Sequence, residues 1–339
     1  MVNDGKRSGP GLPADASTLY DRLAGAVFGL LVGDALGVPY EFTPPGEIPA
    51  REQIEMTPPL GFPRAHTIVP VGTWSDDGAQ ALCLLASLLD QCRLDPDDFA
   101  KRLLDWYERG YMAVDGLVFD VGVQTAAALR ALAGGATALE AGPSEERHNG
   151  NGSLMRVLPL ALWHRGSDAE LSHDAMTQSR VTHGHARSRV CCALYCLWAR
   201  RILQGHTDPW ADAVTSVRGL VQTGSAEEEA LEFHIRPDEK PEGRGSGYVV
   251  DTLRSARMVS ELGSYETCIR AAIALGHDTD TTACVAGGIV GLREGVEGIP
   301  IRWRDALRGR ELVQPLLDRL VARWTSPIPA SVDEGTGSA

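Results

Sequence analysis

Small residues dominate one stretch near the end of the chain, and they restrict what this sequence can fold into. Residues 274–292 read ALGHDTDTTACVAGGIVGL, and the second half of this stretch holds Ala283, Ala286, Gly287, Gly288 and Gly291. Residues without large side chains predict a thin helix that can approach its neighbours closely. Aspartate and threonine precede it, and their side-chain oxygens suit a helix start because they accept hydrogen bonds from free amides. We therefore expect a closely packed helix here.

Two carboxylates, Asp278 and Asp280, lie where that helix should begin. Buried carboxylates repel each other and lose solvation unless a cation or a proton compensates them. A hard cation such as Mg²⁺ or Mn²⁺ prefers oxygen ligands of this kind. A second acidic pair, Asp76 and Asp77, lies far earlier in the chain, in GTWSDDGAQALCLL. Our central hypothesis is that the two pairs meet across one metal site. The alternative for each pair is an ordinary group of helix caps.

Apolar residues recur with helical spacing over most of the chain after Ser75. With an Ala- and Gly-rich first segment, the pattern predicts helices at 20–37, 76–92, 97–109, 119–133, 153–164, 168–178, 186–203, 210–221, 248–262, 264–275, 281–292 and 303–323. Asp97 and Ser264 occupy positions expected for N-caps. Neither runs of alternating β-branched residues nor a βαβ rhythm is present. We therefore expect one compact all-α domain.

Two internal segments interrupt the helical pattern. Residues 38–72 are rich in proline and lack periodicity, which indicates an ordered loop that arches over a functional region. Residues 222–247 are polar and rich in glycine, which predicts a surface excursion. Both ends of the chain are rich in Gly, Pro and Ser. We expect disordered tails at 1–17 and 327–339, which flank a helical domain at 18–326.

Charge and composition exclude several classes of protein. The net charge is −13, which argues against a broad nucleic-acid surface because phosphate binding depends on clustered Lys and Arg. We find no apolar run of about 18 residues and no signal-peptide core, so neither a transmembrane helix nor a membrane partner is expected. Cys191, Cys192 and Cys196 lie in a helical pattern without zinc spacing, which indicates buried thiols. A reduced, cytoplasmic protein fits. The sequence does not indicate an oligomeric state.

Further candidate side chains lie in turns. Glu41 stands between Tyr40 and Phe42 in a Pro-flanked turn, where partial burial would raise its pKa and suit it to proton transfer. The alternative is a solvent-facing Glu. Asp120 precedes VQTAAALRAL and is either a plain N-cap or a lone catalytic carboxylate.

Two more turns contain glycine, asparagine or histidine. Residues 149–156, NGNGSLMR, are predicted to run into a helix whose free amides could bind a phosphate. A tight turn is the alternative. His183 and His185 precede another helix, and without a nearby cysteine or third histidine we expect substrate or structural hydrogen bonding and no zinc.

The segment from Asp278 to Thr282 also matches the Asp-x-Asp-x-Thr signature of haloacid-dehalogenase-like phosphatases, in which the first Asp is a nucleophile. That interpretation needs a buried strand before the motif and a lysine after it. The preceding CIRAAIALGH looks helical, and no lysine follows Lys240. We keep it as the weaker alternative.

Taken together and in this order, the motifs resemble the ADP-ribosylglycohydrolase family, of the dinitrogenase-reductase-activating glycohydrolase and ADP-ribosylarginine hydrolase type. The segments that resemble it are GAVFGLLVGDALGVPYEF, GTWSDDGAQALCLL, FDVGVQTAAAL, GNGSLMRVLPLAL, RVTHGHARSR, GSGYVVDTL and ALGHDTDTTACVAGGIVGLREGVEGIP. The resemblance covers residues 20–325. It implies an all-α, single-domain orthogonal helical bundle around a binuclear metal site with two Mg²⁺ or Mn²⁺ ions.

The resemblance also implies roles by position. The metal ligands would be Ser75, Asp76, Asp77, Asp278, Asp280 and Thr281. The catalytic residues would be Glu41, Asp120 and Asp77. The residues that bind ADP-ribose would be Asp120, Gly122, Asn149, Gly150, Asn151, Gly152, Ser153, Met155, His183 and Tyr248. The chain departs from the family pattern at Ser75 and Gly78, where Thr is usual, and at His277, where Gly is usual.

The implied activity is metal-dependent cleavage of the glycosidic bond between ADP-ribose and an acceptor. Water or hydroxide would attack the anomeric carbon while Glu41 or Asp120 manages protons. The favoured acceptor is an arginine side chain of a mono-ADP-ribosylated protein; serine, a nucleobase or a small ADP-ribosyl ester are also open. A non-catalytic ADP-ribose-binding homologue is the alternative of another class.

Overall fold

A computed structural model describes residues 16–325 of the chain. Within that range the chain forms helices and no β-strand, and its β-pairing is one isolated antiparallel bridge between Gly150 and Tyr248. The all-α prediction is confirmed. The predicted tails fall mostly on residues 1–15 and 326–339, outside the described residues. The first helix begins at Ala16, four residues before its predicted start.

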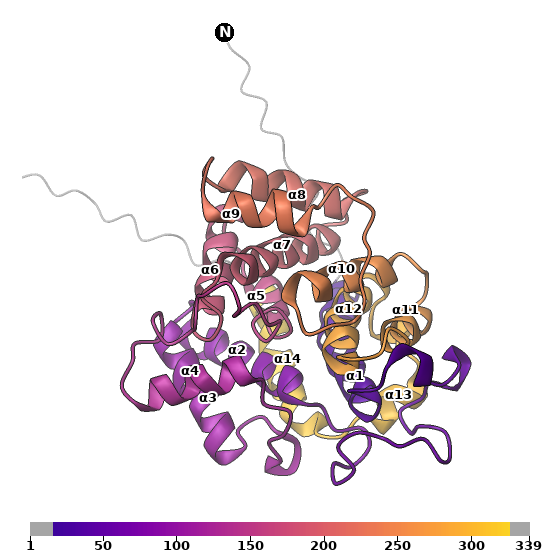
Figure 1. The fold of residues 1–339 in the computed structure, drawn as a ribbon. Coiled ribbons are helices and arrows are strands. Elements are labelled where there is room, and N and C mark those ends of the chain that lie inside the picture. The colour runs from indigo at the N-terminus through magenta and orange to yellow at the C-terminus, as the bar shows by residue number, and fades with distance from the viewer. Residues whose placement is uncertain (1–15, 326–339) are drawn as a thin grey trace, which may run out of the picture.

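The α-helices follow one another along the chain and pack at steep angles in several layers (Figure 1). Their bounds are α1 Ala16–Gly37, α2 Asp76–Gln91, α3 Pro96–Arg109, α4 Val123–Ala133, α5 Leu158–Trp163, α6 Asp168–Arg180, α7 Ala186–Leu203, α8 Pro209–Leu220, α9 Ala226–Glu229, α10 Val249–Ser260, α11 Tyr265–Ile273, α12 Thr279–Glu294, α13 Ile301–Ala306 and α14 Arg310–Thr325.

Helices α1 and α12 lie side by side in antiparallel directions (Figure 1). A Cβ added to Gly33 of α1 would collide with the carbonyl oxygen of Ala283. One added to Gly29 would collide with the carbonyl oxygen of Gly287. The glycines therefore let the two backbones touch, which confirms the predicted close packing of the thin helix. The pair brings the end of α1 beside the acidic start of α12.

Helix α1 has the length and apolar character of a membrane-spanning helix, although no such segment was expected from the sequence. Residues Ser17–Tyr40 are long and apolar enough to cross a membrane by length and composition alone. Their apolar window is completely buried inside the protein. Burial of this kind is typical of the core helix of a folded domain.

Several predicted helix ends are wrong by a few residues. Asp95, and not Asp97, caps α3, because its side chain accepts hydrogen bonds from the next free amides and Pro96 supplies the first helical position. Ser264 caps α11 as predicted. The predicted helix at 303–323 is two helices, α13 and α14, because the chain turns at Gly309 with a positive φ of 71°.

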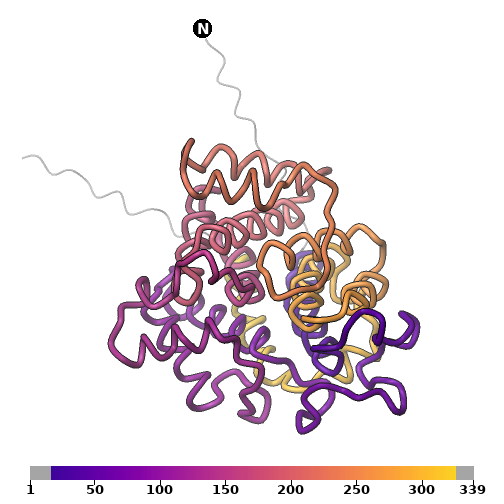
Figure 2. The backbone as a smooth tube through the Cα atoms, in the orientation of Figure 1, coloured from indigo at the N-terminus to yellow at the C-terminus, as the bar shows by residue number. Residues whose placement is uncertain are grey.

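The two irregular segments are ordered and packed. Residues 38–72 form a long loop with short 3₁₀ turns along the lower right edge of the molecule (Figure 2). Residues 222–247 contain α9 and a π-helix, Ala230–Ile235, whose Leu231 and Ile235 side chains are buried. The second segment is therefore only partly the surface excursion that its composition predicts. The predicted buried thiols Cys191, Cys192 and Cys196 lie in the core of α7.

Candidate active site

Asp34 of α1 fixes the start of α2. Its carboxylate is fully buried and accepts hydrogen bonds from the amides of Ser75 (2.9 Å) and Gly78 (2.8 Å). Burial outweighs these bonds and raises the pKa of Asp34 to about 7. The sequence analysis missed this residue, although a lone acid in an apolar helix is a recognisable signal. Asp34 thereby holds the Asp76–Asp77 turn against the core.

The two acidic pairs meet in space. Thr281 Oγ1 of α12 donates a hydrogen bond to Asp77 Oδ2 of α2 at 3.2 Å. Ser75 Oγ donates to the same oxygen at 3.2 Å and accepts from the Asp77 amide, so Ser75 is also the N-cap of α2. Asp76 and Asp278 line one cavity together with Thr281. The predicted convergence is therefore present, and metal binding by these residues stays a prediction.

Several carboxylate oxygens of the acidic cluster have no hydrogen-bond donor among the described residues. Both carboxylate oxygens of Asp280 and Oδ1 of Asp77 are buried without a hydrogen-bond partner in the part of the chain that the structure describes. Burial first, and the neighbouring carboxylates second, raise the pKa values of Asp76, Asp77 and Asp280. Glu41, Asp278 and Asp280 each offer a carboxylate oxygen within 4.8 Å of the other two. Orphaned oxygens in this arrangement fit a hard divalent cation.

The buried guanidinium of Arg156 is linked to the acidic cluster through Gln80. Gln80 Nε2 donates to Asp76 Oδ2 at 2.8 Å, and Arg156 Nη1 donates to Gln80 Oε1 at 2.7 Å. Arg156 is completely buried, and its guanidinium carbon lies 5.0 Å from the centre of the Phe99 ring. Burial lowers the pKa of Arg156 to about 10, so its charge persists at neutral pH. This chain of hydrogen bonds orients Asp76 from behind.

Asn151 joins three segments at the cavity floor. Its Nδ2 donates to Asp278 Oδ2 at 2.8 Å and to Thr252 Oγ1 at 3.0 Å. Its amide donates to the carbonyl of Gly247 at 3.1 Å. Gly247 therefore lines the cavity, although the sequence analysis placed its segment on the surface.

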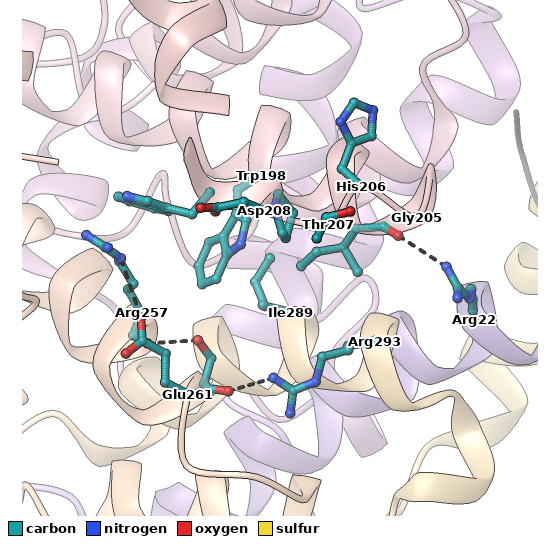
Figure 3. A pocket seen from close by; sticks show the side chains of 14 residues that line it. Arg22, Trp198, Gly205, His206, Thr207, Asp208, Arg257, Glu261, Ile289 and Arg293 are labelled. Atoms are coloured by element: carbon teal, nitrogen blue, oxygen red, sulfur yellow. Dashed lines mark hydrogen bonds and ion pairs between the residues drawn. The ribbon is translucent and has the colours of Figure 1, made fainter. Parts of the chain in front are cut away.

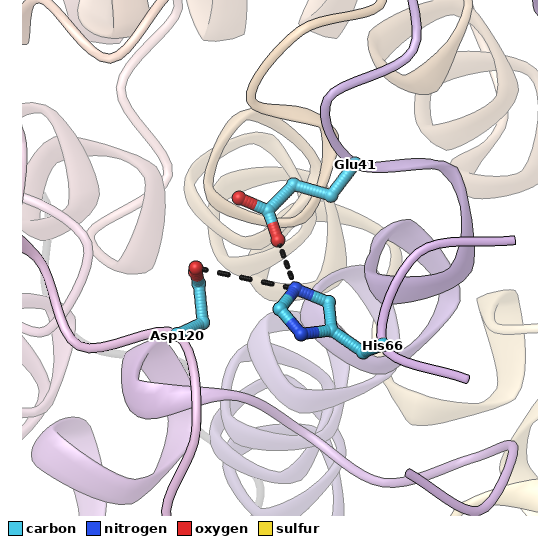
Figure 4. Close-up of side chains that lie close together, drawn as sticks. All are labelled: Glu41, His66 and Asp120. Atoms are coloured by element: carbon cyan, nitrogen blue, oxygen red, sulfur yellow. Dashed lines mark hydrogen bonds and ion pairs between the residues drawn. The ribbon is translucent and has the colours of Figure 1, made fainter. Parts of the chain in front are cut away.

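Three titratable side chains, Glu41, His66 and Asp120, lie close together (Figure 4), and Glu41 and Asp120 also line the cavity. His66 Nε2 lies 2.5 Å from Glu41 Oε2 and 4.0 Å from Asp120 Oδ1. Burial, followed by the charges of Asp120 and Asp278, raises the pKa of Glu41 to about 10. Burial and the charge of Asp278 raise the pKa of Asp120 to about 6. The sequence analysis missed His66, because nothing in its Pro-rich neighbourhood points to Glu41.

Asp120 is not a helix cap. Its backbone is left-handed, with φ of 53°, and α4 begins only at Val123 with Gly122 in the N-cap position. The left-handed turn ends the loop and lets the carboxylate face the cavity. The predicted helix at 119–133 is thus four residues too long at its start.

The cavity has a volume of about 540 Å³. It brings together most of the predicted substrate-binding residues, namely Asp120, Gly122, Gly150, Asn151, Gly152, Met155 and His183. It also contains Gln124, Arg147 and His148, which the sequence analysis did not select. Gln124 Oε1 accepts from the amide of Gly150 at 3.2 Å.

Three predicted substrate-binding residues lie outside the lining of this cavity. Ser153 is completely buried and accepts a hydrogen bond from Ser179 Oγ at 2.8 Å. Asn149 is buried, and its Nδ2 donates to the Glu146 carbonyl at 2.6 Å. Tyr248 is the N-cap residue of α10 and pairs with the backbone of Gly150. These residues shape the turn without being part of the cavity lining, and their role in substrate binding stays a prediction.

The turn at 149–156 does not run directly into a helix as predicted, and anion binding by it stays a prediction. Helix α5 begins at Leu158, well after the glycines, and is only six residues long. The Asn151 amide is already engaged by Gly247. The glycines serve another purpose, because a Cβ on Gly152 would lie 2.9 Å from the His183 ring. Burial lowers the pKa of His183 well below its usual value, so the imidazole is neutral. His185, in contrast, caps α7.

A second cavity of about 400 Å³ lies at the other end of α12 (Figure 3). Three arginines on its rim each donate to a backbone carbonyl: Arg22 to Ile202, Arg257 to Pro237 and Arg293 to Ser260. Of its two carboxylates, Asp208 caps α8 and Glu261 lies 3.9 Å from Arg257. These side chains hold helix ends together, and the lining offers no cluster of free carboxylates.

The phosphatase interpretation is wrong for this fold. It needs a buried strand before Asp278, and the structure has helix α11 there. A nucleophilic role for Asp278 in that chemistry loses its support.

Comparisons with known proteins agree with the geometry. The profile described as ADP-ribosylglycohydrolase matches residues 15–329. An ADP-ribosylarginine hydrolase, Tri1, of Pseudomonas putida (strain GB-1) is 31% identical over 306 residues, covering 89% of this chain and 78% of the relative. The ADP-ribosyl-[dinitrogen reductase] glycohydrolase of Rhodospirillum rubrum is 29% identical over 298 residues, covering 86% and 91%.

A solved structure supports the same assignment. It is described as an ADP-ribosylglycohydrolase-related protein complex, with a TM-score of 0.73 and 32% identity. The match covers 91% of this chain and 99% of that chain. These relatives are hydrolytic enzymes that act on ADP-ribosyl groups, as their names state. The chain belongs to the ADP-ribosylglycohydrolase family.

Proposed function

We propose that the protein is a divalent-metal-dependent hydrolase that releases ADP-ribose from a mono-ADP-ribosylated protein side chain, with arginine as the favoured acceptor. The observation that supports this most is the group of uncompensated carboxylates around Asp280. Two Mg²⁺ or Mn²⁺ ions would be held by Ser75, Asp76, Asp77, Asp278, Asp280 and Thr281. Such ions, when bound, polarise sugar oxygens and lower the pKa of water.

The chain's own carboxylates suit the rest of the reaction. Cleavage of a ribosyl bond builds positive charge at the anomeric carbon, and Asp76, Asp278 and Glu41 lie along the cavity where they would stabilise it. We assign proton transfer to Asp120 and Glu41. Asp120 is the more accessible of the two, with 21% of its side chain exposed against 5% for Glu41. It is therefore the better placed to take a proton from incoming water.

The cavity is polar in a way that would orient ADP-ribose. Its lining contains the carboxylates of Glu41, Asp76, Asp120 and Asp278 together with Arg147 and His148. A volume of this size is within the usual range for small-molecule sites, about 300–1,000 Å³. We place the ribose at the carboxylates and the pyrophosphate toward Arg147, whose guanidinium can bind phosphate oxygens.

Arginine is favoured as the acceptor for two reasons. The relative from Pseudomonas putida is named an ADP-ribosylarginine hydrolase. A guanidinium leaving group is also cationic, and Glu41 and Asp120 form an acidic surrounding for it. Serine, a nucleobase and a small ester are the other acceptors to compare. We also propose a cytoplasmic location, with ADP-ribosylated proteins or small molecules as partners.

The test is to incubate the protein with a panel of ADP-ribosylated acceptors and Mg²⁺ or Mn²⁺, and to measure free ADP-ribose. We expect release from ADP-ribosylarginine, which EDTA abolishes. The Asp77→Ala and Asp278→Ala variants should lose this release while remaining folded. Asp318→Ala, which removes an exposed carboxylate from α14, is the matched control and should keep full activity.

Two results would contradict the proposal. Full activity of Asp278→Ala, or of the wild-type protein in EDTA, would exclude the metal-dependent mechanism. Binding of ADP-ribose without any release from the whole panel would favour the non-catalytic homologue.

A further inference from the structure

Glu41 belongs to two groups of side chains at once. One of its oxygens lies 2.5 Å from His66 Nε2. Its carboxylate is also within 4.8 Å of those of Asp278 and Asp280. Glu41 therefore stands between an imidazole and the acidic start of α12, as Figure 4 shows for the imidazole side.

Without a donor, Glu41 would have little reason to point inward. The carboxylates of Asp120, Asp278 and Asp77 repel it, and burial disfavours its charge. His66 gives the Glu41 carboxylate a nitrogen donor, and a side-chain hydrogen bond also joins Glu41 to Asp120. The His66 contact opposes the tendency of Glu41 to swing out to solvent.

The loop around His66 holds the imidazole in place. His66 has a left-handed backbone, with φ of 47°, and its carbonyl accepts from the Val69 amide at 2.8 Å. Arg64 Nη2 closes the same turn by donating to the carbonyls of Thr67 (3.1 Å) and Val69.

Two aromatic rings flank the imidazole. The centre of the Phe119 ring lies 5.1 Å from that of His66, and the Phe42 ring lies 5.7 Å away on another side. Phe42 follows Glu41 directly, and Phe119 precedes Asp120. These tilted ring contacts therefore tie His66 to the segments that carry Glu41 and Asp120.

We propose that His66 is a positioning residue: its hydrogen bond holds the Glu41 carboxylate toward Asp278 and Asp280. The assignment rests on the proposed function, because an inward Glu41 matters when divalent ions bind there. Partners of this kind, which orient a carboxylate next to a metal, change metal affinity or activity by about 10- to 100-fold when removed. The role requires a hydrogen bond and no change in the charge of His66.

The test compares two substitutions in the full-length protein. His66→Phe keeps a flat ring between Phe42 and Phe119 but removes the hydrogen bond. His66→Gln keeps an N–H at a similar reach without the ring. His173→Gln, on the exposed face of α6, is the control. The readouts are the Mn²⁺ dissociation constant of the metal-free protein, followed by the EPR signal of free Mn²⁺, and kcat and KM with ADP-ribosylarginine.

We expect His66→Phe to weaken Mn²⁺ binding and to lower kcat, each by about tenfold or more, with little change in KM. His66→Gln should stay within about threefold of the wild-type protein in both, since it restores the donor. Wild-type Mn²⁺ affinity in His66→Phe would overturn the assignment, as would an equal loss in both variants with a lowered melting temperature. A wild-type protein that binds no Mn²⁺ would instead overturn the proposed function itself.

Discussion

At the scale of single residues, Asp280 destabilises the folded protein, and the same unpartnered carboxylate is available to bind a cation. Both of its carboxylate oxygens are buried and unpartnered among the described residues. A buried charge without compensation destabilises the folded protein, and replacing such charges is often neutral or stabilising.

We therefore predict opposite effects of Asp280→Asn on stability and activity. Without metal at pH 8, the variant should be as stable as the wild-type protein or more stable, by up to about 4 kcal/mol, because one buried charge is gone. With metal it should lose activity by about 100-fold or more and gain no stability from Mn²⁺. Urea unfolding with and without Mn²⁺ checks this. A metal-free variant that is clearly less stable than wild type would contradict it.

The sequence could identify acidic residues but not all of their supports. Asp76, Asp77, Asp278 and Asp280 stand out as two acidic pairs, each at the start of a predicted helix. Gln80 and His66 are ordinary residues in their own segments, and Asp34 stands out only as a lone acid in an apolar helix. Their importance comes from partners at distances of 2.5–2.9 Å that are remote in the chain (Ser75 for Asp34, Arg156 for Gln80 and Glu41 for His66), and periodicity carries no information about such contacts.

At the scale of helices, the contact between α1 and α12 positions the acidic cluster. Thr279 Oγ1 of α12 donates to the Gly37 carbonyl at 2.8 Å, and Tyr265 Oη of the neighbouring α11 donates to the Gly29 carbonyl at 2.6 Å. Such short contacts depend on glycine at the interface.

Gly33→Ala should destabilise the protein by about 1–3 kcal/mol or more, because the new methyl group would collide with the carbonyl of Ala283. Gly219→Ala is the matched control, since a Cβ there meets no atom within 4 Å. That change, in the last turn of α8, should be neutral or stabilising by up to about 1 kcal/mol. The free energies of unfolding in urea give the comparison. Equal effects of the two changes would show that the helices do not touch as described.

Helix existence could be predicted better than helix ends. The apolar spacing of α7 and α10 is long and regular, so both were expected within a few residues. The start of α4 was not, because the left-handed backbone of Asp120 has no signature in a sequence that reads FDVGVQ. The turns before α5 were likewise merged with the helix that follows them.

At the scale of the whole molecule, the acidic cavity makes stability depend on pH. The pKa values of Asp34 and Asp120 are raised to about 7 and about 6, above the ordinary value of 3.8. Between about pH 4 and pH 7 the folded state therefore binds more protons than the unfolded state. Stability from both groups is therefore complete below about pH 4 and is lost as pH rises to about 7.

The metal-free protein should thus melt at a lower temperature at pH 8 than at pH 5.5. Mn²⁺ competes with protons for the same oxygens, so it should raise the melting temperature more at the higher pH. Calorimetry in EDTA and in Mn²⁺ checks both statements. A larger effect of Mn²⁺ at the lower pH would contradict them.

The arrangement of the whole chain was only partly predictable. The order of motifs indicated the fold family, and an arching loop at 38–72 was expected from its prolines. The loop sequence did not indicate which of its side chains would contact the site, because His66 reaches Glu41 only through the left-handed turn at 66–69. The packing of residues 222–247 against α10 could not be predicted either, since the glycines of this segment allow contacts that its composition does not specify.

The most direct measurement is anomalous diffraction from a crystal soaked in Mn²⁺. The account predicts peaks between α2 and α12, with oxygens of Asp76, Asp77, Asp278 and Asp280 at about 2.2 Å. The absence of a peak there, with the ions bound elsewhere on the protein, would contradict it.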